Sequence, residues 1–229
     1  MNPLVSIVVV TYNRALFLKE ALDSIQRQTF KDYEIILVDD GSTDNTKEIV
    51  EQYERIRYIY QEHGGISKAR NKAVKAAKGT WIATLDSDDL WKEEKLQKQV
   101  DYVRAHPGCS IVYTSYSNFT DIPEDELDER QRDLLRTNNK CYLPSALIEA
   151  KLFDKIGLYD EALLWSEDTD WIIRLKISGL VEEHHLDEIL YFRRVHTFNI
   201  SYSRKKLYRM DLCKKISAVI YKKAKRSKK

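Results

Sequence analysis

Short apolar runs that end in polar residues recur along the first half of the chain. Residues 4–11 (LVSIVVVT) form one β-branched run, and residues 34–40 (EIILVDD) form a second that ends in acids. Runs of this kind predict strands that are buried on both faces, as in parallel sheets. Further strands are predicted at 56–60 and at 80–85 (TWIATL), and the acids of 86–89 follow the latter.

Helical spacing separates these strands. A helix is predicted over 14–28 because apolar residues recur on one of its faces. That face is formed by Phe17, Ala21, Leu22 and Ile25. Other helices are predicted at 66–77 and at 45–54, where Asn45 and Glu48 resemble a capping box. The alternation of strand and helix predicts an α/β fold, with an open, mostly parallel sheet flanked by helices on both faces.

The second half of the chain has a less regular pattern. Six Asp or Glu within residues 121–129 predict a solvated loop. The other predicted elements are a helix at 92–105, a strand at 109–117, helical spacing around 166–178, and strands near 181–186 and 188–194. We find no hinge-like linker, and we therefore predict one domain with an elaborated second half, followed by a C-terminal segment over 204–229.

Composition narrows the class of protein. Of 229 residues, 43% are hydrophobic and 32% are charged, which is too apolar for intrinsic disorder. The apolar run at 4–10 is far shorter than the roughly 20 residues of a membrane-spanning helix, and no positive charge precedes it as in a secretory signal. We therefore expect a cytoplasmic chain. Cys109, Cys141 and Cys213 are widely spaced, which predicts neither a zinc site nor a disulfide framework.

The net charge of +2 conceals an asymmetry. Residues 214–229 contain eight Lys or Arg and no acid, which leaves residues 1–213 at −6. An excess of basic charge that lies only in a tail argues against a nucleic-acid partner, which favours a basic binding face. The segment 204–225 carries apolar residues on one helical face and lysines on the other. It predicts either peripheral contact with an anionic membrane at the inner face of the cell or a helix that packs on the domain.

Acids gather where the predicted strands end. Asp86 and Asp88 follow an apolar strand, and alternate residues of an extended segment point the same way. Two such carboxylates suit Mg²⁺ or Mn²⁺ that also binds substrate phosphates. The competing interpretation is a turn with helix-capping aspartates. Asp39 likewise ends a strand before the Gly41-Ser42 turn, where it could bind a nucleobase or ribose or simply stabilise the turn.

Three further segments carry candidate chemistry. Gly64-Gly65 opens a helix, whose N–H groups and Arg70 could meet an anion, although Arg70 could equally be a solvated charge. Residues 165–174 combine Glu167, Asp168 and Asp170 with Trp165, Trp171 and Arg174; the spacing of Asp170 and Arg174 predicts an ion pair on one helix face. The tryptophans suit packing on a sugar or burial in the core. His196 becomes a metal ligand only if the fold returns it to the acids of 86–89.

The ordered set of these segments resembles the family 2 glycosyltransferases, which have the glycosyltransferase A-type (GT-A) fold. The matching segments are SIVVVTYNR (6–14), VDDGSTDNT (38–46), GGISKARN (64–71), LDSDD (85–89), SEDTDWIIRL (166–175) and RVHTFNIS (194–201). Each motif is weak alone, whereas their order is specific. The resemblance does not extend clearly to residues 120–140 or to the tail, and the QxxRW signature of processive synthases is absent.

The resemblance implies roles for individual residues. Those expected at the nucleotide-sugar are Thr11, Tyr12, Arg14, Asp39, Arg70 and Asp86. Asp88 resembles the family's metal ligand, with His196 as a second contact, and Asp168 resembles the general base beside Glu167. The residues expected at the acceptor or in support are Trp165, Asp170, Trp171 and Arg174. The implied domain covers 1–203, with a nucleotide-sugar-binding half at 1–105 and an acceptor-side half at 106–203.

The implied reaction is metal-dependent, inverting transfer of a sugar from a nucleoside diphosphate, UDP being favoured, to a saccharide or lipid-linked acceptor in cell-surface polysaccharide or lipopolysaccharide biosynthesis. Mn²⁺ or Mg²⁺ is the expected cofactor. Two alternatives stay open: a nucleotidyltransferase, and an inactive nucleotide-sugar-binding scaffold. A dinucleotide-binding dehydrogenase is disfavoured because no GxGxxG follows the first strand.

Overall fold

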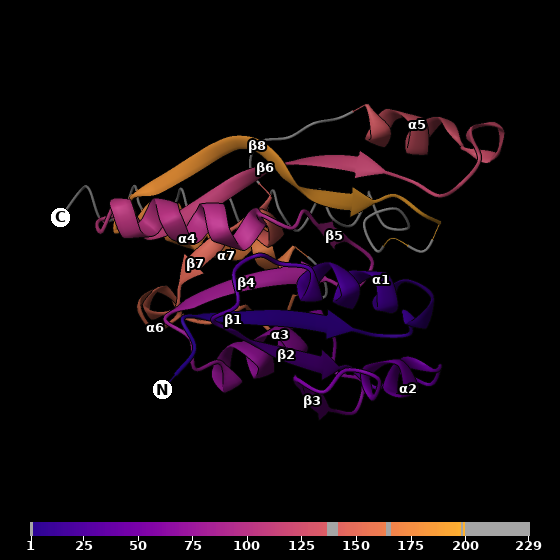
Figure 1. Cartoon of the computed structure of the whole chain (residues 1–229), viewed down its shortest axis with the longest axis horizontal. Helices are drawn as coiled ribbons and strands as arrows, with labels where there is room; N and C mark the ends of the chain where they lie inside the picture. The colour runs from indigo at the N-terminus through magenta and orange to yellow at the C-terminus, as the bar shows by residue number, and fades with distance from the viewer. Residues whose placement is uncertain (1, 137–141, 164–165, 198, 200–229) are drawn as a thin grey trace.

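The chain folds around a single mixed sheet (Figure 1). The computed structural model describes residues 2–136, 142–163, 166–197 and 199, so the predicted tail at 204–229 and Trp165 lie outside the described residues. Within the described residues, eight strands form one sheet in the order β3-β2-β1-β4-β7-β6-β8-β5. The strands are β1 (Val5–Thr11), β2 (Tyr33–Asp39), β3 (Ile56–Tyr60), β4 (Trp81–Asp86), β5 (Leu90–Trp91), β6 (Ile111–Phe119), β7 (Leu147–Glu149) and β8 (Glu183–Arg194). The helices are α1 (Ala15–Gln26), α2 (Thr46–Val50), α3 (Ile66–Ala76), α4 (Lys95–Ala105), α5 (Glu129–Leu135), α6 (Lys151–Ile156) and α7 (Glu167–Ser178).

The first half of the sheet is parallel, as the buried apolar runs predict. β1 pairs in parallel with β2 and with β4, and β2 pairs in parallel with β3. In this register Thr11 lies opposite Asp39, and Val10 lies opposite Asp86. The polar residues that end β1, β2 and β4 therefore meet at one edge of the sheet.

The second half of the sheet is mixed. β7 pairs antiparallel with both β4 and β6, and β5 pairs antiparallel with β8. The two strands predicted near 181–186 and 188–194 are one continuous strand, β8, which runs parallel to β6. Its register shifts opposite Thr114 and Ser115, and this irregularity explains the interrupted pattern in the sequence.

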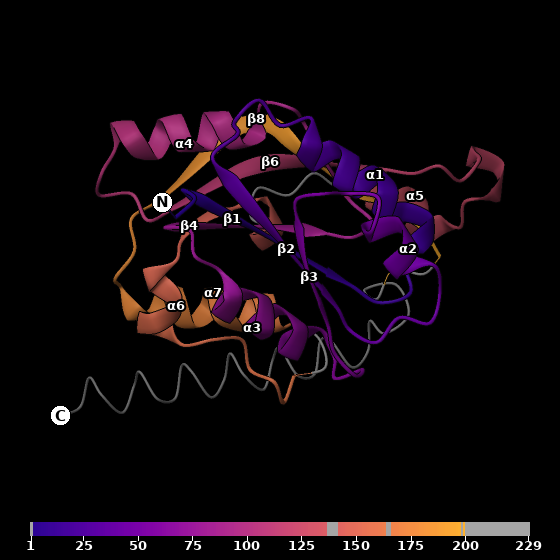
Figure 2. The same ribbon diagram turned by 60° about the horizontal axis from the view of Figure 1, so that its bottom comes forward.

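Helices cover both faces of the sheet, as expected. Figure 2 shows α1 and α4 on one face and α3, α6 and α7 on the other. Each face has its own apolar core: Leu22 and Val100 belong to the first, and Ala73 and Trp171 belong to the second. Because both faces are covered, the C-terminal edge of the parallel strands stays available for polar side chains.

Two local predictions are wrong. Asn45 precedes α2 but makes no capping bond through its side chain; instead the Asp44 carboxylate accepts bonds from the N–H and hydroxyl of Thr46. The acidic stretch at 121–129 is not all loop, because a 3₁₀ helix forms over Glu124–Glu126 and α5 begins at Glu129 behind a capping box of Asp128 and Gln131. In both places the acid bonds backbone N–H groups that the helix itself cannot satisfy.

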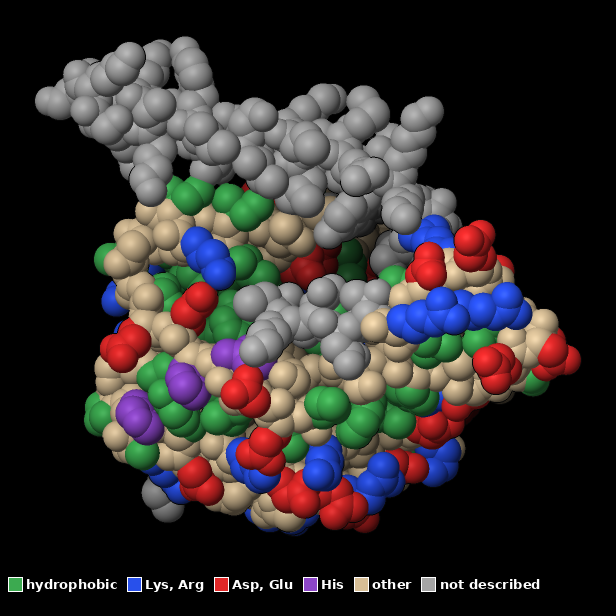
Figure 3. All heavy atoms as spheres, turned by 90° about the horizontal axis from the view of Figure 1, so that it is seen from above, with side chains coloured by type: hydrophobic (Ala, Val, Ile, Leu, Met, Phe, Trp, Pro, Cys, Tyr) green, Lys and Arg blue, Asp and Glu red, His purple; other side chains and the backbone are tan. Residues whose placement is uncertain are grey.

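Among the described residues, no helix combines the length and the apolar character needed to cross a bilayer. On the face drawn in Figure 3, basic and acidic side chains are interspersed over the surface.

Candidate active site

Asp39 at the end of β2 is buried and fixes the turn that follows. One oxygen of its carboxylate accepts a hydrogen bond from the backbone N–H of Ser42 at 2.8 Å, and the other accepts one from the Tyr58 hydroxyl at 2.7 Å. Thr11 lies beside it on β1, and its hydroxyl is buried. The Asp39 carboxylate thus holds the turn after β2 and the Tyr58 side chain in place.

The neighbouring Asp40 was not among the expected site residues, yet it holds the glycine turn in place. Its two oxygens accept hydrogen bonds from the backbone N–H groups of Gly64 and Gly65, each at 2.9 Å. Gly41 lies so close to the same loop that a Cβ there would be 2.8 Å from the backbone nitrogen of His63. No side chain fits at position 41, which explains the glycine in VDDGS.

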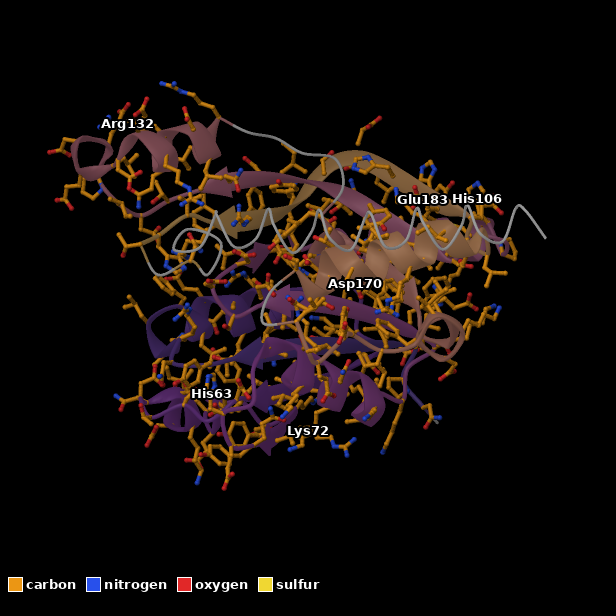
Figure 4. The ribbon with its side chains drawn as sticks, turned by 180° about the vertical axis from the view of Figure 1, so that it is seen from behind. His63, Lys72, His106, Arg132, Asp170 and Glu183 are labelled. Carbon is orange, nitrogen blue, oxygen red and sulfur yellow. The ribbon has the colours of Figure 1, made fainter. Side chains whose placement is uncertain are left out.

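Tyr12 presents an aromatic surface beside this turn. Its side chain is 40% exposed, and its ring stacks on His63 with centroids 4.1 Å apart. His63 is itself fixed, because its Nδ1 lies 2.9 Å from an Asp40 carboxylate oxygen. The His63 ring, labelled in Figure 4, backs a platform on which a flat ring can stack.

The acids of 86–89 diverge to different partners, although sequence reasoning expected Asp86 and Asp88 to converge. Asp86 accepts hydrogen bonds from Arg70 at 2.8 Å and from the Tyr142 hydroxyl at 3.0 Å. Asp88 instead lies 2.9 Å from Nε2 of His196 and 3.8 Å from Nε of Arg14. The two carboxylates therefore have separate tasks at the same edge.

Asp89 anchors the loop after β4 to strand β8. It is buried, and its oxygens accept hydrogen bonds from the Tyr191 hydroxyl at 2.6 Å and from the backbone N–H of Arg194 at 2.8 Å. Burial, together with the charges of Asp88 and Asp86, raises its pKa well above the usual range. This carboxyl group ties the loop after β4 to β8.

Asp88 and His196 supply a donor set that fits a divalent cation. One carboxylate and one imidazole from distant segments meet at 2.9 Å, and the His196 ring packs on Phe17 at 4.6 Å. A hard cation of this kind is commonly held by one or two protein ligands together with substrate phosphates. Within the described part of the chain there is no group of three or more His, Cys, Asp or Glu side chains suited to a metal.

The acid pair opens α7 and is joined to the loop by Arg70. Arg70 is 5% exposed, and its guanidinium contacts Glu167 at one end and Asp86 at the other. Burial raises the pKa of Glu167 to about 7; the Arg70 charge opposes this effect, and the Asp168 charge adds to it. Asp168 is more exposed than Glu167 and accepts a hydrogen bond from the backbone N–H of Thr169 at 2.6 Å. Both acids thus lie at the same edge of the sheet as Asp86.

The other residues of the α7 motif support the helix. Asp170 and Arg174 form the ion pair that their spacing predicts, at 2.9 Å. Arg174 also donates to the carbonyl oxygens of Ile156 and Leu158. Trp171 is fully buried, stacks on Phe153 and donates its indole N–H to the Gly157 carbonyl. Because of this burial, Trp171 does not pack on an acceptor sugar.

Several buried polar atoms have no hydrogen-bond partner in the part of the chain that the structure describes. They include the hydroxyls of Thr11 and Ser166 and the Nε of Arg70. Ser166 also has a left-handed backbone, with a φ of 64°, directly before the acid pair. Unpaired buried donors and strained residues cost free energy, and they cluster where a ligand binds.

Sequence reasoning missed four residues that hold the site: Asp40, Tyr142, Tyr191 and Arg194. Arg194 donates to the Asp88 carbonyl at 2.9 Å and to Glu20 at 2.7 Å, and it also pairs with Asp121. Its place inside the RVHTFNIS motif was a usable signal, whereas Tyr142 and Tyr191 lie in no motif. Their roles arise only from long-range contacts.

Comparison with known proteins identifies the family. Residues 6–157 match the family described as Glycosyl transferase family 2. The chain belongs to the family 2 glycosyltransferases. It is 34% identical over 209 residues to an uncharacterized glycosyltransferase of Rickettsia typhi, covering 85% of this chain and 65% of that one. It is 41% identical over 121 residues to a Bacillus subtilis glycosyltransferase named for teichuronic acid biosynthesis, TuaG, covering 51% of this chain and 48% of that one.

Solved structures place the family 2 chain in the GT-A fold, which confirms the expected fold class. S. aureus TarS 1–349 in complex with UDP-GlcNAc superposes with a TM-score of 0.72 at 24% identity, over 89% of this chain and 61% of that one. A mannosyltransferase of Pyrobaculum calidifontis in complex with GDP-Man and Mn²⁺ has a TM-score of 0.68 at 21% identity, over 87% and 59%. The chain thus spans less than two thirds of the length of these proteins.

Proposed function

We propose that this chain transfers a sugar from a nucleoside diphosphate, with a UDP-sugar favoured, to a hydroxyl of a saccharide or lipid-linked acceptor in glycan biosynthesis. The observation that carries the proposal is the meeting of three groups at one edge of the sheet: the aromatic platform of Tyr12, the Asp88–His196 pair, and the acid pair of α7. The relatives' names and the UDP-sugar bound to TarS support the substrate class.

The donor is bound by its flat base and its charged diphosphate. The base stacks on Tyr12, for a gain of about 1–3 kcal/mol. The nucleotide is proposed to contact Thr11, Asp39, Arg14 and Arg70. Asp86 is proposed to lie near the ribose. Asp88 and His196 would hold Mn²⁺ or Mg²⁺ together with the phosphates, and that ion supplies charge stabilisation to the departing diphosphate. Arg14, whose Nε lies 3.8 Å from Asp88, would add positive charge at the same place.

The acceptor is activated at α7. Asp168 accepts the proton of the acceptor hydroxyl while the hydroxyl oxygen forms a bond to the anomeric carbon. The bond from that carbon to the diphosphate oxygen breaks, and the diphosphate leaves with the electron pair. Attack from the face opposite the leaving group inverts the anomeric centre. Because the diphosphate is a good leaving group, no general acid is needed on its side.

Calorimetric titration with a panel of nucleoside diphosphates, with Mn²⁺ and with chelator, tests the donor assignment. We expect one diphosphate, UDP, to bind only with metal, and Asp88→Asn to weaken that binding at least about tenfold because a charged ligand is lost. Lys98→Met, at an exposed ion pair on α4, is the matched control. Binding of no diphosphate by the wild type would favour an inactive scaffold, and undiminished binding by Asp88→Asn would remove Asp88 from the metal site.

A further inference from the structure

One buried cation serves two carboxylates that belong to different halves of the domain. Arg70 on α3 contacts Asp86, which ends β4, and Glu167, which begins α7. Its side chain is 6% exposed, and that of Glu167 is 5% exposed. Water and salt screen these contacts little, so a change of charge at one carboxylate is felt by the other through the shared guanidinium.

The Asp86 end of this bridge is itself held firmly. The carboxylate oxygen that does not face Arg70 accepts a hydrogen bond from Tyr142. The Tyr142 ring packs on Tyr116 and meets Tyr191 edge to face, with centroids 5.0 and 5.3 Å apart. This bond opposes any movement of Asp86 with the guanidinium, so the contact between Arg70 and Glu167 is the one more readily changed when Arg70 moves.

Arg70 also has one N–H group that is not used in a hydrogen bond to the described residues. Its Nε is buried and has no partner among the described residues, while both terminal nitrogens hold carboxylates. An anionic ligand beside Asp86 would compete with Glu167 for this guanidinium, both through space and through the unused N–H.

Building on the proposed function, we propose that Arg70 is a positioning residue that couples binding of a nucleoside diphosphate beside Asp86 to the orientation of the Glu167–Asp168 pair. Without a bound nucleoside diphosphate, Arg70 stays paired with Glu167. A bound anion draws the guanidinium toward the donor, and this releases the acid pair for the acceptor. Coupling of this kind is reciprocal, so removal of the Glu167 charge must change the affinity for the diphosphate.

A double-mutant cycle with UDP affinity as the readout tests this coupling. Wild type, Glu167→Gln, Arg70→Met and the double variant are titrated with UDP and Mn²⁺ at pH 8, where Glu167, with a pKa raised by burial to about 7, is mainly ionised. We expect Glu167→Gln to bind UDP about fivefold more tightly or better, because the Arg70 charge is no longer shared. In the Arg70→Met background the same substitution should have no effect.

Two further variants keep the test decisive. Glu183→Gln removes an acid that pairs with Lys176 of α7 at 3.2 Å, and it should leave the affinity unchanged; Glu183 is labelled toward the upper right of Figure 4. If Arg70→Met does not fold, Arg70→Lys replaces it, because an ammonium cannot hold both carboxylates and should lose the coupling. Unchanged affinity in Glu167→Gln, or an equal change with and without Arg70, would overturn the inference. Failure of the wild type to bind any diphosphate would overturn the proposed function as well.

Discussion

At the scale of single residues, Lys95 is a buried charge that the proposed reaction does not use. It is 0% exposed, donates to the Gln99 side chain at 2.9 Å, and lies 4.2 Å above the Trp91 ring. Burial lowers its pKa to about 7, far below that of a lysine in the unfolded chain. At neutral pH, folding therefore deprotonates the Lys95 amine in a large share of the molecules, and this lowers the stability of the folded state.

We expect Lys95→Met to raise the free energy of unfolding at pH 7 by about 1–4 kcal/mol. Because the folded pKa is depressed, the unfolded state binds more protons between pH 7 and 10, so wild-type stability rises with pH through this window. The advantage of Lys95→Met should shrink accordingly between pH 7 and 9. Urea unfolding at both pH values measures it, with Lys98→Met on the exposed side of α4 as the control. A lower stability than wild type at pH 7, or a gain that is equal at both pH values, would contradict the expectation.

At the scale of elements, α7 carries the acid pair and is tied down along its length. Arg174 pairs with Asp170 and donates to the carbonyls of Ile156, which ends α6, and of Leu158 just beyond it, while Trp171 bonds the Gly157 carbonyl. These bonds satisfy carbonyl groups at and just after the end of the short helix α6. The helix is thus fixed against α6, and its first turn is held at the sheet edge by Arg70.

Arg174→Met should lower the free energy of unfolding by about 1.5–3 kcal/mol, because charge-assisted bonds to the Ile156 and Leu158 carbonyls are lost. UDP affinity should change little, because the donor residues lie on other elements. Urea denaturation and calorimetry measure the two quantities. Lys176→Met, at an exposed pair on the same helix, provides the control. A stability equal to that of wild type would show that these bonds do not hold α7.

At the scale of the whole molecule, the site exists because two halves of the domain meet at one sheet edge. β1, β2 and β4 supply the side proposed to bind the sugar donor, through Thr11, Asp39 and Asp86. The second half returns β8 beside β6, which brings His196 to Asp88 and Arg194 to the backbone of the same loop. The residues proposed for donor binding and for proton acceptance therefore lie on different segments, so each can be substituted by itself.

Asp168→Asn should reduce sugar transfer by about 10²–10⁴-fold and leave UDP affinity within about twofold of wild type, because only proton acceptance is lost. Transfer kinetics and calorimetry on the same preparation check both halves of this expectation. Thr169→Val alters the neighbour of Asp168 without removing a carboxylate, and it serves as the comparison. Normal transfer by Asp168→Asn would assign the base elsewhere, with Glu167 as the next candidate.

The extent of correct prediction differs between the two halves of the sheet. The strand at 56–60 and the helices beginning near residues 15 and 66 agree closely with prediction, because apolar periodicity is a local signal. The three-residue β7 and the two-residue β5 went unpredicted, since such short segments contain no period. Helix α5 was missed because it begins at the end of the acidic stretch of 121–129, although its capping box can be read in the sequence.

The sequence by itself determined that acids and aromatic residues follow parallel strands, and that the ordered motifs are those of a family 2 glycosyltransferase. It also determined the Asp170–Arg174 pair, because helical spacing is local. Only the tertiary structure decided that Arg70 bridges Asp86 and Glu167, that Tyr142 holds Asp86, and that Lys95 is buried. The physical reason is that such contacts join segments up to 97 residues apart, and no periodicity along the chain records which distant side chains will share a low-dielectric interior.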